Sequence, residues 1–130
     1  MRSTNLRAAL VAALLAPVAA LACGVCVEDK IAAVYDHAAV HQALAAKRTV
    51  VFFAIDGKLV ANERTRRSIA EMARATAGVD ARSVRVSTEL ASMVLAFDAR
   101  RTNLVRVQES LEGRLSALGL SLLAMQVRDL

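Results

Sequence analysis

The residues with the clearest chemical potential are the chain's two cysteines, Cys23 and Cys26, which are separated by Gly24 and Val25. Two thiols at this spacing can capture a soft metal ion or exchange a disulfide, and a helix that follows them favours the thiolate form. Thiolate sulfur selects Cu(I) or Zn(II) over hard ions, although a zinc site needs two further ligands. The pair therefore predicts a site for Cu(I) or Zn. The alternative is a thiol–disulfide exchange partner in which Cys23 attacks and Cys26 resolves.

Two histidines, His37 and His41, are candidates for additional metal ligands. Residues four positions apart project from one face of a helix, so the two rings could share an ion. In a helix that begins near Val27, Cys26 and His37 would lie about 16 Å apart along the axis, at a rise of 1.5 Å per residue. A single four-ligand site would then require the cysteine arm to fold back. The alternative is that both histidines are half-buried packing residues beside an apolar stripe.

Residues 1–22 have the pattern of a cleavable secretory signal peptide. Arg2 and Arg7 precede an apolar run over residues 8–18, and Ala20 and Ala22 supply small residues before a cleavage point. The run is shorter than the roughly 20 apolar residues that a bilayer core requires. We therefore expect export to a periplasmic or secreted location, with Cys23 at the mature N-terminus. Lipidation of Cys23, which would anchor the domain to a membrane, is the alternative.

Removal of residues 1–22 would leave 108 residues with a formal charge of +3, because the signal holds two of the 17 basic residues and none of the 12 acidic ones. A chain of this length forms one domain with one core. The mild charge does not indicate a nucleic-acid partner, and the motif of RNA-recognition domains is absent from the sequence. We also find no Gly-rich phosphate loop, no Ser/His/Asp set and no paired acids, so the sequence does not favour an enzyme.

The apolar patterns predict seven helices and strands after the signal peptide. Periodicity predicts helices, alternation or short β-branched runs predict strands, and Asn62, Gly78, Asn103 and Gly119 mark helix ends. The elements are expected over 27–47 (helix), 49–55 (strand), 62–77 (helix), 83–87 and 93–97 (strands), 103–118 (helix) and 120–127 (strand).

After the first helix, the order is that of a ferredoxin-like α+β domain, βαββαβ, in which two helices cover one face of a four-stranded antiparallel sheet. The domain is expected over residues 49–130, and residues 23–48 carry the Cys-x-x-Cys and an extra N-terminal helix. Phe52 and Phe53 point to opposite faces of the first strand, so we expect the extra helix to cover the otherwise open face of the sheet.

Within this domain, the strands at 83–86 and 93–98 and the helix ending at Leu118-Gly119 resemble the second half of a heavy-metal-associated domain. The resemblance is topological. It implies a metal-binding module like those of copper chaperones and metal pumps, in which a Cys-x-x-Cys lies between the first strand and the first helix. In this chain that loop is Asp56-Gly57-Lys58-Leu59-Val60 and contains no thiol. The Cys-x-x-Cys is instead displaced to the mature N-terminus.

The sequence therefore leaves three functions open. The first is a small exported protein that binds a soft metal ion through Cys23 and Cys26, with His37 and His41 as further ligands. The second is a thiol–disulfide exchange partner. The third is a lipoprotein or adaptor domain that binds another protein without thiol chemistry.

Overall fold

The computed structural model describes residues 26–130, so the predicted signal peptide and Cys23 lie outside the described residues. The helices are α1 (Val27–Ala32), α2 (His37–Ala45), α3 (Glu63–Arg74) and α4 (Leu104–Leu115), with short 3-10 turns η3 (Ala81–Ser83) and η4 (Ser116–Leu118). The strands are β1 (Thr49–Asp56), β2 (Arg85–Ser87), β3 (Ser92–Phe97) and β4 (Ser121–Arg128).

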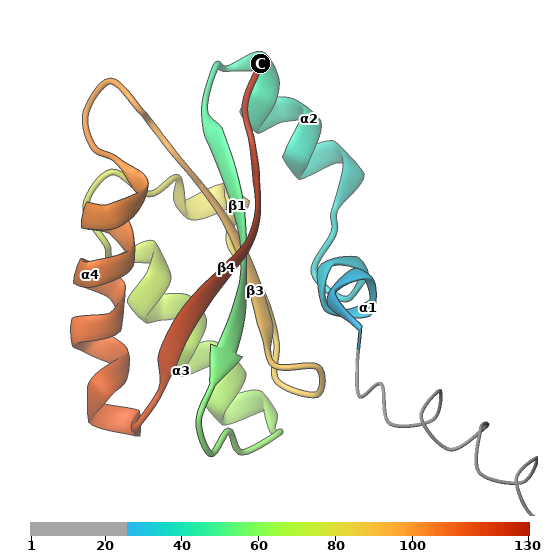
Figure 1. Cartoon of the computed structure of the whole chain (residues 1–130), viewed down its shortest axis with the longest axis vertical. Coiled ribbons are helices and arrows are strands. Elements are labelled where there is room, and N and C mark those ends of the chain that lie inside the picture. The colour runs from blue at the N-terminus through green and yellow to red at the C-terminus, as the bar shows by residue number, and fades with distance from the viewer. Residues whose placement is uncertain (1–25) are drawn as a thin grey trace, which may run out of the picture.

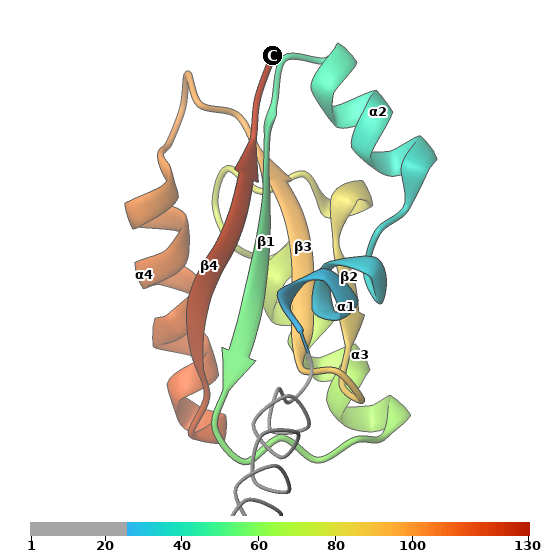
Figure 2. The same ribbon diagram turned by 45° about the vertical axis from the view of Figure 1, so that its right-hand side comes forward.

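The four strands form one antiparallel sheet in the order β2-β3-β1-β4. The chain enters the sheet at its centre, on β1, and the two later crossovers place α3 and α4 on the same face (Figure 1). This arrangement confirms the predicted ferredoxin-like fold. Figure 1 views the sheet edge-on, with α1 and α2 on the side opposite to α3 and α4, and Figure 2 shows α1 in front of the sheet.

Because successive side chains of β1 point to opposite faces, this strand contributes to two separate cores. Phe53, Val51 and Ile55 pack with α3 and α4, whereas Phe52 and Val50 pack beneath α1 and α2. Both phenylalanines are fully buried. The prediction that the extra helical segment covers the second face of the sheet is therefore confirmed.

That segment is two helices, and the prediction of one continuous helix over 27–47 is wrong. The helix breaks after Ala32, and Asp36 adopts an extended conformation in which its carboxylate accepts a hydrogen bond from the Ala39 N–H at 3.0 Å. An aspartate at this position caps a new helix and satisfies its free N–H groups. The break lets Val34 and Val40 both reach the second core, in which Ala43 is also buried.

Ion pairs join both ends of α2 to the segment that contains η3 and the edge strand β2. The Asp36 carboxylate accepts a hydrogen bond from the Arg85 guanidinium on β2 at 3.1 Å, and Arg48 pairs with Asp80 just before η3. The Ala39 N–H and the Arg85 guanidinium together hold the pKa of Asp36 below its ordinary value. These contacts fix the direction of α2 across the sheet.

The predicted starts of α3 and α4 are confirmed by their caps, whereas α3 ends at Arg74, before the predicted end at residue 77. Asn62 and Asn103 each accept a hydrogen bond from the backbone N–H three residues later, at 2.8 and 3.0 Å. Gly119 adopts a left-handed conformation, with a φ of 69°, directly after η4.

We predict that Phe52→Ala lowers the free energy of unfolding by about 3–5 kcal/mol, the usual cost of truncating a fully buried phenylalanine. The side chain fills the interface between the sheet and the α1–α2 layer, and the mutation would leave a cavity there. Urea denaturation followed by circular dichroism measures the change.

Leu123→Ala provides a matched control. Leu123 pairs with Ala54 and so lies on the same face of the sheet as Phe52, but it is 66% exposed. Its truncation should cost less than about 1 kcal/mol. Equal losses for the two variants would show that α1 and α2 do not seal this face.

Candidate metal site

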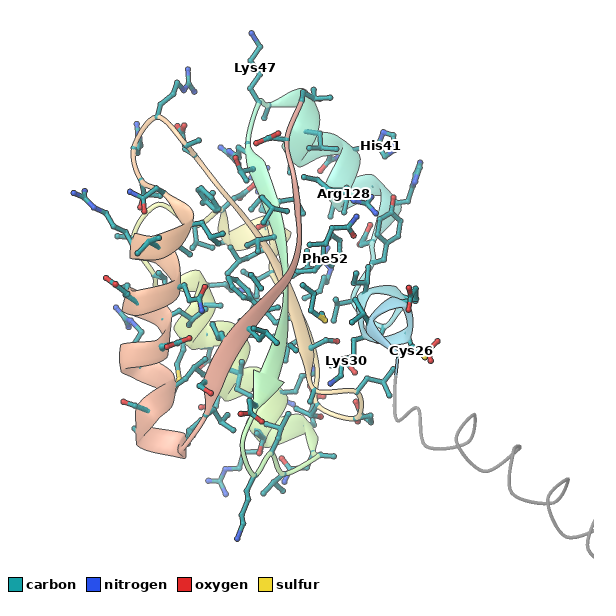
Figure 3. The ribbon with its side chains drawn as sticks, viewed as in Figure 1. Cys26, Lys30, His41, Lys47, Phe52 and Arg128 are labelled. Carbon is teal, nitrogen blue, oxygen red and sulfur yellow. The ribbon has the colours of Figure 1, made fainter. Side chains whose placement is uncertain are left out.

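Cys26 is the residue that precedes α1, and its side chain is exposed (Figure 3). Its carbonyl oxygen accepts hydrogen bonds from the Asp29 and Lys30 N–H groups, both at 3.1 Å, so the backbone at Cys26 is fixed by the first turn of the helix. The thiol forms no disulfide within residues 26–130. Cys23, the second predicted ligand, lies outside this range.

The position of α1 is fixed by Lys30, which reaches across to the turn between β2 and β3. Its ammonium group donates hydrogen bonds to the carbonyl oxygens of Leu90, at 2.8 Å, and Ala91, at 3.4 Å. Ile31, on the next position of the helix, packs against the second core. Figure 3 shows Lys30 extending from α1 toward this turn, with Cys26 at the neighbouring end of the helix.

The β2–β3 turn lies at the end of the sheet where β1 also finishes. Ala54 pairs with Ser92, and the Ile55 N–H donates to the Ala91 carbonyl at 2.8 Å. The loop that follows β1, residues 56–60, contains no thiol. The Lys30 contact therefore ties α1 to the end of the sheet where this loop begins.

The loop after β1 is itself closely packed. Gly57 has a φ of 120°, and a Cβ atom there would approach the Gly119 carbonyl oxygen to 2.5 Å. A side chain at Gly57 is therefore excluded both by backbone conformation and by the connection that leads into β4.

The charges nearest to Cys26 along the chain are acidic. Glu28 and Asp29 are exposed in the first turn of α1, whereas the Lys30 ammonium is engaged by the β2–β3 turn. Two exposed carboxylates in the turn that follows Cys26 attract cations. The surroundings of Cys26 thus favour a ligand that carries positive charge.

His37 and His41 lie together on α2, and their ring centroids are 4.0 Å apart. Both side chains are exposed, so the prediction of half-buried packing histidines is wrong. Among residues 26–130, no three His, Cys, Asp or Glu side chains lie close enough together to hold one metal ion. The histidines therefore form a pair of their own, without Cys26.

A groove of about 660 Å³ lies beside α1, between this helix and β4. Arg128 forms part of its wall and stacks over the rings of Tyr35 and Phe52, with its guanidinium carbon 5.6 Å from each centroid. This contact could not be predicted from the sequence, because it depends on the register of a strand at the far end of the chain. The groove is lined by Val27, Glu28, Ile31, Ala32, Tyr35, Met125, Gln126 and Arg128.

Met93 is fully buried in the core between the sheet and the helices α3 and α4. Arg66 and Arg67 on α3 bind Glu63, and the Arg66 guanidinium lowers the pKa of that carboxyl to about 2. Within residues 26–130, no helix combines the length and apolar character needed to cross a bilayer.

No protein-family model and no curated protein sequence matches the chain. Among solved structures, a copper-binding domain from HMA7, a P-type ATPase, aligns with 62% of this chain and 97% of that domain, at a TM-score of 0.50 and 14% identity. Oxidized MerP from Ralstonia metallidurans CH34 aligns with 60% of this chain and 99% of that one, at a TM-score of 0.47 and 18% identity. The predicted resemblance to a heavy-metal-associated, ferredoxin-like domain is thereby confirmed as a similarity of fold.

We predict that Lys30→Met frees α1 from the β2–β3 turn while it preserves the apolar stem of the side chain. A hydrogen bond from a charged donor contributes about 1.5 kcal/mol, so amide exchange within α1 should accelerate by roughly tenfold. Hydrogen exchange at the Ala33 amide, which donates to Asp29 at 3.0 Å, reports this opening.

Lys47→Met is the matched control, because Lys47 is an exposed lysine that follows α2. It should leave exchange in α1 unchanged. If the two variants gave the same exchange rates in α1, the Lys30 contact would not position this helix.

Proposed function

We propose that the protein is a small exported metal-binding protein that holds one Cu(I) ion between Cys23 and Cys26. The observation that carries this proposal is the exposed position of Cys26 at the start of α1, a helix that Lys30 fixes to the β2–β3 turn. Cys23 precedes Cys26 by three residues, a spacing at which two thiols can bind the same ion. Soft thiolate ligands favour Cu(I).

The fold supports a metal-binding role. The HMA7 domain with which the chain shares its fold is a copper-binding domain. In heavy-metal-associated domains the thiols follow the first strand of the sheet, whereas here Cys26 directly precedes α1, the helix that Lys30 fixes to the β2–β3 turn. The proposal is therefore that the family's ligand pair is supplied from a different part of the chain.

The ligand set favours Cu(I) over Zn(II). Two sulfurs satisfy Cu(I), whereas a closed zinc site needs four ligands. His37 and His41 do not join Cys26 in a group of three ligands within the described residues. A zinc ion held by Cys23 and Cys26 would thus retain open positions, which is unfavourable for a structural site.

The predicted export signal would place this chemistry outside the cytoplasm. Cleavage after Ala22 would leave Cys23 as the first residue, with the two thiols at the tip of the mature chain. Free thiols oxidise in such compartments unless they are bound or kept reduced. A bound Cu(I) ion protects both sulfurs, so we expect the metal-loaded form to resist oxidation.

We predict that the reduced protein binds one equivalent of Cu(I) in competition with a chromogenic Cu(I) chelator. The combined Cys23→Ser and Cys26→Ser variant should lose this equivalent, because its hydroxyl groups are poor ligands for a soft ion. The absorbance of the chelator complex measures the copper that the protein withdraws.

His37→Ala combined with His41→Ala provides the control, and it should bind Cu(I) as tightly as the unmodified protein. Tight Cu(I) binding that survives the loss of both cysteines would contradict the proposal. So would a protein that binds no Cu(I) but has a dithiol potential well above the roughly −300 mV limit of structural disulfides, since that is the property of an exchange partner.

A further inference from the structure

The histidine pair on α2 is a second group of metal-ligating side chains, and the proposed Cu(I) site does not use it. His37 is the first residue of α2 and His41 lies one turn later, so their side chains are neighbours on the helix surface. Their ring centroids are 4.0 Å apart, with the ring planes inclined at 42°. These two residues are the chain's two histidines.

We propose that His37 and His41 chelate a divalent transition-metal ion, with Cu(II) the most strongly bound. An ion that is 2.0–2.1 Å from a nitrogen of each ring requires those nitrogens to lie about 3 Å apart. Rings whose centroids are 4.0 Å apart can present two nitrogens at that separation after a small rotation. Both side chains are exposed, so the rings can rotate and water can fill the remaining coordination positions.

The helix that carries the pair is held at both ends. Asp36 caps its start and binds Arg85 at 3.1 Å, and Arg48, beyond its end, pairs with Asp80. A chelate built on a fixed backbone loses less conformational entropy on binding than one on a mobile segment. The Asp36 carboxylate is occupied by these contacts, which leaves the two imidazoles as the protein ligands.

The chemistry of the pair differs from that of the cysteines. Imidazole nitrogen suits divalent copper, nickel and zinc, and Cu(II) forms the strongest complexes among divalent first-row ions. Thiolates favour Cu(I). The protein would therefore hold the two oxidation states of copper at separate positions, one before α1 and one on α2.

This inference can be tested without the thiols. Protein that carries Cys23→Ser and Cys26→Ser is titrated with Cu(II) and followed by electron paramagnetic resonance. We expect one equivalent with hyperfine coupling to two imidazole nitrogens. Adding His37→Ala or His41→Ala should weaken binding by roughly 10–100-fold, because the second nitrogen of a chelate binds intramolecularly.

A variant that keeps two histidines but separates their rings provides the decisive control. His41→Ala combined with Gln42→His places the second ring five residues from His37, on a different face of α2. Gln42 is exposed, so the exchange does not disturb the core. We expect this variant to bind Cu(II) as weakly as His41→Ala alone. Undiminished binding in this variant, or in the protein without His37 and His41, would overturn the inference.

Discussion

The structure depends on the burial of β1 from both sides. Phe52 and Phe53 are adjacent and both fully buried, and a single layer of helices can cover only one of them. A ferredoxin-like sheet with helices on one face would leave Phe52 and Val50 exposed to water. Covering them with α1 and α2 is the hydrophobic constraint that draws the N-terminal segment across the sheet, and with it Cys26.

Apolar burial alone would allow α1 and α2 to slide over this face, and polar contacts at their ends restrict them. Lys30 binds the carbonyl oxygens of the β2–β3 turn, Asp36 binds Arg85, and Arg48 binds Asp80. Beside α1, the Arg128 guanidinium lies over the rings of Phe52 and Tyr35. The exposed thiol and the histidine pair are thus both carried by a layer whose position is fixed by named contacts with the sheet.

Much of this architecture could be predicted from the sequence, because the relevant signals are local. The β-branched run of β1, the asparagine caps and the opposed phenylalanines each depend on a few neighbouring residues. The break at Asp36 was missed because the apolar periodicity continues across it. Because one helical phase was carried through the break, the histidines were also misplaced. They belong to a second helix, whose buried residues are Val40 and Ala43.

The Lys30 and Arg128 contacts could not be predicted, because they join residues that are about 60 or more positions apart. They also depend on strand register, including the irregularity of β4 opposite Phe52 and Phe53.

The most direct test of the account is native mass spectrometry of the protein recovered from the exported fraction and loaded with Cu(I). The account predicts a chain that begins at Cys23, carries no acyl group and gains the mass of one copper ion less the protons that it displaces. A chain that begins beyond Cys26, or one acylated at Cys23, would contradict it, because the pair of free sulfurs would then not exist.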